Sequence, residues 1–460
     1  MPKSIGALLP ALLIAPLASA FFACADRTIA LVEIDHVAEE KVLLDVSENR
    51  DVDILFVVDN SRSMAREQTS LGDKFSKVID TLAQHPDGLP SIHIAVVSTD
   101  LGGGGDQNIC GISGDGGQFQ GSACNSLNGP FLSSIVQEDG SRIENFSGTP
   151  AETFSCMSAL GINGCGFEQP LESMRRALSA PQAESFLREH AYLAVVIVTD
   201  EDDCSAKDPN VYNSAVQDLD SSLGPAKSFR CFEFGVECDQ DGDDVRALGP
   251  RSGCVPRDDS EYLYDVDEYV QFLYDLKKSP KQVLVATIAG ELSPVQVVPK
   301  YDEQQDLDYV ALDFSCTRED AEAVPPIRLS AFVNGFAADS GQETSICEDD
   351  LSGALQDIAN LINNQAAACF SGNLADIDAA EPGLQPECIV TLSEPDLDDR
   401  RIGTCDNLAS PQSSSVLPCF TLTENPTCAN TPTGLSPKVY YPEGLLVPID
   451  TTADVRCLAP

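Results

Sequence analysis

The chain has 460 residues, a formal net charge of −45, four histidines and no tryptophan. A chain of this length can bury a large core and is expected to form more than one folded unit. The balance of 28 basic against 73 acidic residues excludes nucleic-acid binding through a basic patch. The same balance favours the binding of cations, although most of the carboxylates are expected to form a solvated surface.

Residues 1–24 are predicted to be an export signal, with a weakly basic start and an apolar core. Ala18-Ser19-Ala20 fits an ordinary signal peptidase, whereas Phe21-Phe22-Ala23-Cys24 resembles a bacterial lipoprotein box. Lipidation of Cys24 is favoured because it leaves 17 − 1 = 16 cysteines, an even number for disulfides in an oxidising compartment. We therefore predict an outer-membrane lipoprotein of the bacterial cell envelope, with a secreted soluble protein as the alternative. The lipid anchor is the only expected membrane contact, since no later segment has the ~18 unbroken apolar residues of a membrane helix.

A short N-terminal segment, residues 25–49, precedes the first clear strand. Ile54 to Val58 form an unbroken apolar run, which is typical of a strand buried on both faces of a parallel sheet. Apolar residues then recur with helical spacing between Ala65 and Gln84. The loop between them leaves the carboxyl end of a strand and enters a helix, which is where ligands bind in open α/β sheets.

Strands and helices continue to alternate along the chain. The predicted elements are strands at 92–99, 192–198, 282–289 and 328–336, and helices at 168–180, 266–276 and 351–362. Long irregular insertions interrupt them near 101–150, 204–260 and 291–326. The alternation predicts an α/β fold over residues 50–368, with a doubly wound, mainly parallel sheet and flanking helices. Residues 369–460 are rich in Pro, Gly, Ser and Cys, and predict a small β-rich module held by disulfides.

The sequence Asp59-Asn60-Ser61-Arg62-Ser63 after the first buried strand resembles the metal-ion-dependent adhesion site of von Willebrand factor A domains. One carboxylate and two hydroxyls are hard oxygen ligands that suit Mg²⁺, or Mn²⁺ or Ca²⁺ in its place. Such a ligand set leaves one position open for a carboxylate of a partner protein. The alternative interpretation is an ordinary Asp/Ser cap at the start of a helix.

The strand at 192–198 ends in Thr199 and a run of four acidic residues. In this family a strand ending in Thr-Asp brings a second carboxylate to the metal through a water, and the resemblance gives that role to Asp200. The family's metal-binding Thr falls at Cys165, and a disulfide-bonded cysteine cannot replace a hydroxyl toward a hard cation. Glu168, Ser158 or a water is then expected to take its place. The predicted metal ligands are Asp59, Ser61 and Ser63, with Asp200 through water.

Two further features concern cations and cysteines. The acidic run from Asp239 to Asp244 is similar to calcium-binding loops but lacks the distal Glu of an EF-hand, so a solvated turn is favoured over an extra Ca²⁺ site.

No two cysteines form a CxxC pair, which argues against zinc ribbons and dithiol redox sites. Disulfides are expected instead, and the candidate local pairs are Cys110–Cys124, Cys156–Cys165 and Cys238–Cys254.

These features predict a binding protein and not an enzyme. The sequence has no HExxH pattern and no Gly-x-Ser-x-Gly elbow. We predict metal-ion-dependent protein–protein interaction or adhesion on the cell envelope, in which an acidic side chain of the partner completes the coordination of Mg²⁺. Two alternatives stay open: a structural envelope scaffold with a weak or vestigial metal site, and a metal-dependent hydrolase.

Overall fold

The structure is a computed structural model of the chain. It describes residues 38–460 apart from 47–49, 86–87, 105–109, 111–113, 138, 241, 243, 306, 319–320, 349, 366–367, 379, 381–383, 396, 426–427, 429–430, 443–446 and 448–450. The predicted export signal and the lipidation site Cys24 lie outside the described residues. The described residues from Glu39 onward belong to one compact unit, Glu39–Pro460.

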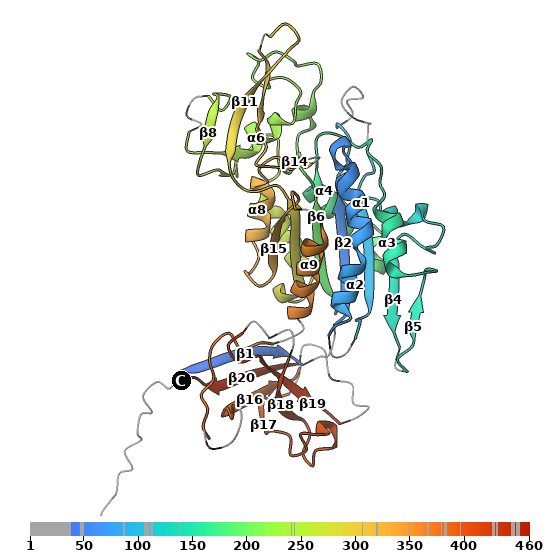
Figure 1. Cartoon of the computed structure of the whole chain (residues 1–460), viewed down its shortest axis with the longest axis vertical. Helices are drawn as coiled ribbons and strands as arrows, with labels where there is room; N and C mark the ends of the chain where they lie inside the picture. Colours follow the sequence, from blue (N-terminus) through green and yellow to red (C-terminus); the bar gives the residue numbers. More distant parts are fainter. Residues whose placement is uncertain are drawn as a thin grey trace, which may run out of the picture. The chain divides into compact units, whose positions relative to one another are not determined.

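A seven-stranded sheet carries the strands that the sequence marks as buried (Figure 1). In spatial order its strands are β15 (Gly341–Ser345), β10 (Val283–Ala289), β6 (Tyr192–Val198), β2 (Val52–Val58), β3 (Ile92–Ser98), β4 (Leu132–Val136) and β5 (Arg142–Glu144). The five strands from β15 to β3 run parallel, and β4 and β5 are added antiparallel at one edge. Strands β2, β3 and β10 are buried along their whole length, which explains their unbroken apolar sequences.

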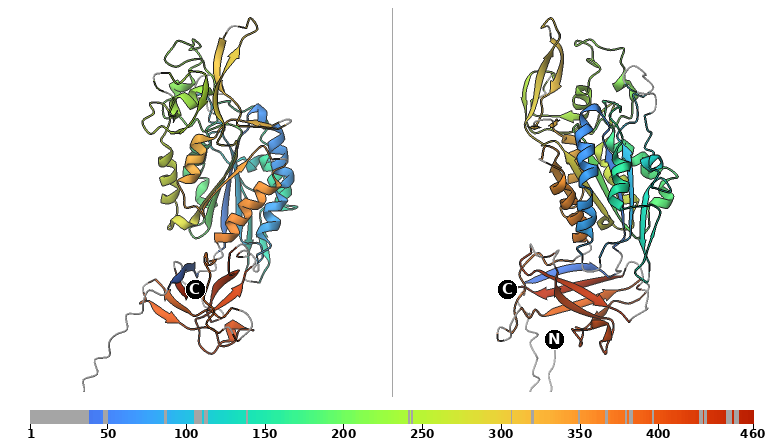
Figure 2. Two further views of the ribbon diagram at one scale, coloured as in Figure 1. Left: turned by 60° about the vertical axis from the view of Figure 1, so that its left-hand side comes forward. Right: turned by 45° about the vertical axis from the view of Figure 1, so that its right-hand side comes forward.

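Helices cover both faces of this sheet (Figure 2). One face is packed by α1 (Ala65–Lys74), α2 (Ser76–Leu82), α3 (Pro150–Ser158) and α9 (Ser352–Gln365), and the other by α4 (Pro170–Ser179), α5 (Ala183–Phe186), α7 (Val266–Asp275) and α8 (Ile327–Asn334). Successive residues of β2 serve opposite faces. The ring of Phe56 lies 4.7 Å from that of Phe154 in α3, whereas Leu55 packs with Leu171 of α4. None of the described helices combines the length and the hydropathy that crossing a membrane requires.

Most predicted elements are present, and two predictions are wrong. The expected helix over 65–84 is divided at Phe75 into α1 and α2. Residues 328–336 were expected to form a strand, but residues 328–334 belong to the helix α8, which ends at Asn334. The apolar residues of that segment explain the difference, because Leu329, Phe332 and Val333 follow helical spacing and are buried together against the sheet.

The insertions form structure of their own. The first carries a short 3₁₀ helix η2 (Gln120–Ala123) and the edge strands β4 and β5. The second contains η3 (Pro209–Tyr212), α6 (Phe229–Gly235), β7 (Val236–Glu237), β8 (Gly249–Arg251) and β9 (Val255–Pro256). The third contains β11 (Val295–Tyr301), β12 (Leu307–Leu312), β13 (Cys316–Arg318) and β14 (Ala321–Ala323), and η4 (Pro280–Gln282) precedes β10. Strand β11 pairs with β8 and with β12, so the second and third insertions share one antiparallel sheet.

The C-terminal residues form antiparallel sheets around a separate apolar core. Their elements are β16 (Cys388–Ser393), β17 (Arg400–Ile402), η5 (Pro411–Ser413), β18 (Cys419–Glu424), β19 (Leu435–Tyr440) and β20 (Thr452–Leu458). Strand β1 (Glu39–Asp45), from the N-terminal segment, pairs with β20 and completes a four-stranded sheet. The two ends of the described chain are therefore joined by hydrogen bonds in one sheet.

The predicted fold class is wrong for the chain as a whole. Ten of the fourteen described strand pairs are antiparallel and four are parallel. The described chain is β-rich with mainly antiparallel pairing, and its parallel strand pairs all lie among the five strands named above. Short antiparallel strands with one exposed face alternate apolar and polar residues, so they produce no long apolar run in the sequence.

Eight disulfides join the sixteen cysteines that the structure describes. The pairs are Cys110–Cys165, Cys124–Cys156, Cys204–Cys231, Cys238–Cys254, Cys316–Cys347, Cys369–Cys428, Cys388–Cys457 and Cys405–Cys419. The predicted pair Cys238–Cys254 is confirmed. The predicted pairs Cys110–Cys124 and Cys156–Cys165 are wrong, because the fold brings Cys110 to Cys165 and Cys124 to Cys156. Which cysteines meet depends on Cα distances set by tertiary packing, and not on nearness in sequence.

Candidate metal centre

The carboxyl ends of β2 and β6 bring two polar segments together. Val58 and Val198 are register partners at the ends of these strands. The residues that follow remain paired, since the Asp59 amide donates to the Val198 carbonyl at 2.9 Å. The Thr199 hydroxyl donates to Asp59 Oδ2 at 2.7 Å, although the two residues are 140 positions apart. Asp59 is completely buried.

The hydroxyls of Ser61 and Ser63 lie beside this carboxylate. The Ser61 amide donates to Asp59 Oδ1 at 2.7 Å, which fixes the turn into the 3₁₀ helix η1 (Arg62–Met64). The two hydroxyl oxygens are 3.1 Å apart. Neighbouring ligands of an octahedral Mg²⁺, each at about 2.05 Å, would lie about 2.9 Å apart, so this spacing suits two ligands of one ion. Ser63 is exposed, which leaves the cluster open to solvent at η1.

Glu168 enters the same cluster from the loop before α4. It is buried, and Glu168 Oε2 accepts a hydrogen bond from the Thr99 hydroxyl at 2.6 Å. Burial and then the negative charge of Asp59 raise the pKa of Glu168 well above its ordinary range. Ser158 lies elsewhere, with its hydroxyl donating to the Ser155 carbonyl. Of the groups expected to compensate for Cys165, Glu168 is therefore the one that the fold places here.

Asp200 and Glu201 complete the acidic cluster. Burial and then the charge of Asp59 raise the pKa of Asp200 to about 7, while a hydrogen bond with Ser63 partly opposes the shift. Burial and then the charge of Asp200 raise the pKa of Glu201 to about 8. Burial likewise raises the pKa of Asp59. Ionisation of these side chains lowers the stability of the folded protein unless a nearby positive charge compensates for their burial and repulsion.

Two buried oxygens show that the donor set fits a cation. Glu168 Oε1 and Asp200 Oδ1 are both shielded from solvent and have no hydrogen-bond partner. A buried carboxylate oxygen without a partner is rare and needs an explanation such as an ion or a water. Across the described residues, no three His, Cys, Asp or Glu side chains form a metal-binding group by themselves. The serine hydroxyls and water would therefore have to supply part of the coordination.

Close packing holds the three loops in place. The Gly164 amide donates to the Asn60 carbonyl at 2.9 Å, and a Cβ on Gly164 would lie 2.1 Å from Asn60 Oδ1. Only glycine allows this approach. Gln68 of α1 donates from Nε2 to the Asp59 carbonyl at 2.8 Å and to the Gly161 carbonyl at 2.9 Å. Helix α1 thus ties the loop after β2 to the loop that leads to Glu168.

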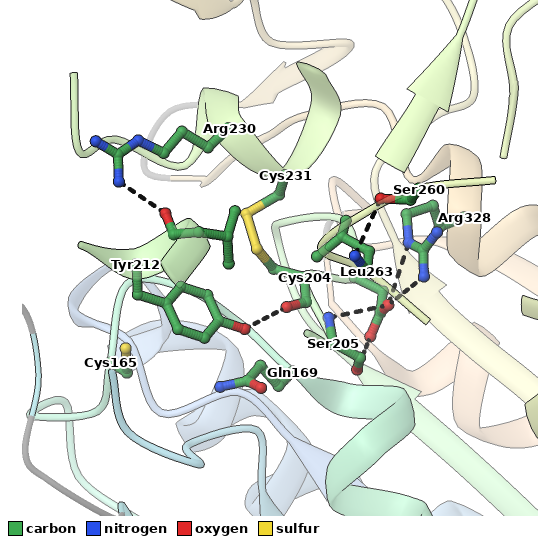
Figure 3. Close-up of a disulfide and its surroundings, with 12 residues drawn as sticks. Cys165, Gln169, Cys204, Ser205, Tyr212, Arg230, Cys231, Ser260, Leu263 and Arg328 are labelled. Carbon is green, nitrogen blue, oxygen red and sulfur yellow. Dashed lines mark hydrogen bonds and ion pairs between the residues drawn. A yellow bond between two sulfur atoms is a disulfide. The ribbon is translucent and has the colours of Figure 1, made fainter. Parts of the chain in front are cut away.

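The remaining acids of the run after β6 have structural partners. Asp202 accepts from the backbone amides at the start of α8, including that of Arg328 at 3.0 Å. Asp203 forms a fully buried ion pair with Arg328, with 3.1 Å between Oδ2 and Nη2. Figure 3 shows the Cys204–Cys231 disulfide next to this pair, with the Tyr212 hydroxyl donating to the Cys204 carbonyl at 2.6 Å. These contacts anchor the loop that carries Asp200 and Glu201.

The structure describes only part of the acidic run from Asp239 to Asp244, which was considered as an extra Ca²⁺ site. Asp241 and Asp243 lie outside the described residues. Of the described acids of this run, Asp239 accepts a hydrogen bond from Ser252, and Asp244 accepts one from the Arg246 amide. The solvated turn that the sequence favours and the extra Ca²⁺ site that is its alternative both stay predictions.

No family model matches the chain. No curated protein matches it either. Among solved structures, similarity is found to the pilus adhesin SpaC of Lactobacillus rhamnosus GG in an open conformation, at 9% identity and a TM-score of 0.34 over 91% of this chain and 42% of that one. The adhesive tip pilin GBS104 of Group B Streptococcus agalactiae has 8% identity and a TM-score of 0.27, covering 91% and 80% of the two chains. The type V pili tip protein Mfa5 of Porphyromonas gingivalis, through its three N-terminal domains, has 12% identity and a TM-score of 0.21, covering 92% and 68%.

These comparisons correct the family assignment. The sequence resemblance predicts a von Willebrand factor A domain, but no family model matches the chain and the similar structures are described as pilus adhesins. We therefore withdraw that assignment. The TM-scores are too low to support a function, and the chain spans less than half of SpaC.

Proposed function

We propose that this protein binds a partner protein on the bacterial cell envelope through a divalent cation. The observation that carries the proposal is the pair of buried, unpartnered oxygens, Glu168 Oε1 and Asp200 Oδ1. The hydroxyl oxygens of Ser61 and Ser63 are 3.1 Å apart, and the Ser63 side chain is hydrogen-bonded to Asp200. A cation would satisfy both carboxylates and offset the burial and the nearby charge of Asp59, which raise their pKa values.

The proposed ligands are oxygen atoms throughout, which favours Mg²⁺, with Mn²⁺ or Ca²⁺ as substitutes. Asp59, Ser61 and Ser63 would hold the ion directly, Asp200 would contribute through a water, and Glu168 is added to this set. When bound, the ion would supply a positive centre that attracts a carboxylate of the partner. The exposed Ser63 marks the side from which that carboxylate would approach.

An exported location is part of the proposal. Eight disulfides join the sixteen cysteines that the structure describes, and disulfides persist mainly in oxidising compartments. The export signal and a lipid anchor at Cys24 are the sequence features that support the cell envelope. The net charge of −45 repels acidic partners at long range, so a bound cation would provide local attraction where the partner docks.

Calorimetric titration of Mg²⁺ into the purified protein tests this proposal. We expect saturable binding of about one ion, lost in the Asp59→Ala variant. Asp357→Ala is the matched control, because Asp357 is an exposed acid on α9 away from the cluster. Equal heats for the Asp59 and Asp357 variants would favour an envelope scaffold, and Mg²⁺-dependent turnover of an ester or peptide panel would favour a hydrolase.

A further inference from the structure

A pocket of about 840 Å³ lies between the second and third insertions. Most of its lining residues fall within 214–232 of the second insertion and 300–324 of the third. The two insertions are held together by the pairing of β8 with β11, and by apolar packing of Phe229 and Phe232 of α6 with Val310 of β12. The volume falls within the range of about 300–1,000 Å³ that is common for ligand sites. We call it the insertion pocket.

Two lysines that line this pocket lie beside the same tyrosine ring. Lys227 Nζ is 4.8 Å from the ring centroid of Tyr309. Lys300 is the register partner of Tyr309 in the antiparallel pair of β11 and β12, so the two side chains project from the same face of the sheet. Lys300 Nζ also lies 5.9 Å from the ring centroid of Phe314. The two ammonium groups therefore belong to one part of the wall, and each lies against an aromatic ring.

These lysines keep their positive charge available to a ligand. Attraction to the face of an aromatic ring orients an ammonium group but does not neutralise it. Among the described residues no carboxylate forms an ion pair with Lys227 or Lys300, although the sequence has 73 acidic residues against 28 basic ones. Lys227 is exposed and Lys300 is half-buried. An anionic group in the pocket can therefore pair with both of them.

The pocket wall also carries two carboxyl groups, which limit the kind of anion that fits. Asp202 accepts hydrogen bonds from the amides of Arg328 and Leu329, whereas the Glu201 carboxyl group accepts none from the described residues. A carboxyl group accepts hydrogen bonds from hydroxyls in either protonation state. The net charge of −45 disfavours ligands with many negative charges. The wall therefore suits a ligand that combines one anionic group with several hydroxyls and an apolar face.

We propose that the insertion pocket binds a hexuronic acid, free or as a unit of a glycan. The single carboxylate of this acidic sugar would pair with Lys227 and Lys300. Its C–H face would stack on the ring of Tyr309 or Phe314, and its hydroxyls would donate to Glu201. Inorganic phosphate has no apolar face, and an acidic peptide has no comparable set of hydroxyls. The binding involves no cation, so the inference is independent of the function proposed above.

Isothermal titration calorimetry with two matched disaccharides tests the inference. The acidic probe is glucuronic acid linked to galactose, and the neutral probe has glucose in place of the glucuronic acid at the same linkage. EDTA is present throughout, so the result does not depend on a bound cation. We expect the acidic disaccharide to bind about fivefold tighter, which corresponds to about 1 kcal/mol. Phe314→Ala is expected to weaken both disaccharides to a similar extent, because stacking does not depend on the carboxylate.

The lysine variants give the decisive comparison. The combined Lys227→Gln and Lys300→Gln change is expected to abolish the fivefold ratio, and each single change to reduce it. Lys281→Gln is the matched control, because Lys281 is an exposed lysine that does not line the pocket, and it should leave the ratio unchanged. Equal affinities of the wild-type protein for the two disaccharides, or a ratio that survives the double change, would overturn the inference.

Competition experiments separate the acidic sugar from other anions. Displacement of the acidic disaccharide by free glucuronate, lost in the double lysine variant, would support the inference and would assign recognition to the single sugar unit. A requirement for the disaccharide would support it with a glycan as the source. Equal displacement by inorganic phosphate, or by a tripeptide with one central aspartate, would show a general anion site and would overturn it.

Discussion

Replacing Asp200 by asparagine is expected to stabilise the protein when no divalent cation is bound. Asp200 is buried, and its pKa is raised from 3.8 to about 7. One pKa unit corresponds to about 1.4 kcal/mol, so about three units amount to about 4 kcal/mol against the ionised form. Burial is the larger cause of this shift and the charge of Asp59 is the next, and an amide at this position is still buried, so we expect about half of the cost, ~2 kcal/mol, to be recovered by the neutral amide.

The sign of this effect depends on pH. Because the pKa is raised in the folded state, the penalty is absent below the unfolded value of 3.8 and grows as the pH rises to about 7. The assay is therefore urea unfolding at about pH 8, in EDTA and in saturating Mg²⁺. Wild-type protein should gain about 3 kcal/mol when Mg²⁺ reaches 100 times its dissociation constant, and Asp200→Asn should gain much less. An Asp200→Asn protein that is less stable than wild type in EDTA, yet is still stabilised by Mg²⁺, would refute this reasoning.

Three further variants test other parts of the structure. Gly164→Ala should weaken Mg²⁺ binding at least tenfold in calorimetry, because its Cβ would collide with Asn60, whereas Gly166→Ala meets no atom within 4 Å and should bind normally. His93 has a pKa lowered to about 4, mainly by burial, so the free energy of unfolding should fall by about 2 kcal/mol between pH 7 and about pH 5, and His93→Gln should flatten that slope. Arg328→Met should cost about 3 kcal/mol in urea unfolding, because its buried aspartate partner loses its counter-charge, and a cost under about 1 kcal/mol would contradict the ion pair.

The sequence predicts the central strands well because long apolar runs are an unambiguous signal. The run at 192–198 is β6 residue for residue. The resemblance to the A-domain motif, together with the rule that such strands deliver polar loops to one edge, grouped Asp59 with the acidic run after β6. The structure then brings Asp59, Ser61, Ser63 and Asp200 into one cluster.

The sequence could not specify which acids face that cluster. Asp200 to Asp203 are four consecutive acids, and two of them are directed to Arg328, more than 120 residues away in sequence. Pairings of that kind depend on how α8 packs, and α8 itself was predicted as a strand. The contact between Gly164 and Asn60 could not be predicted from the sequence either, because a glycine in an irregular loop does not indicate which residue packs against it.

The insertions were the largest gap in the prediction. Their strands are short and partly exposed, so residues 204–260 and 291–326 appeared to be irregular loops. Pairing between β8 and β11 joins these segments across the whole of α7 and β10. No local pattern in either segment indicates that long-range pairing.

The most direct test of the proposed metal centre is anomalous diffraction from crystals of the protein grown with Mn²⁺. We predict a single strong anomalous peak bonded to Asp59 and to the hydroxyls of Ser61 and Ser63, with a carboxylate oxygen of Glu168 in contact and a water between the ion and Asp200. A map without a peak among these residues, at a manganese concentration that saturates Mg²⁺ sites of this kind, would contradict the account.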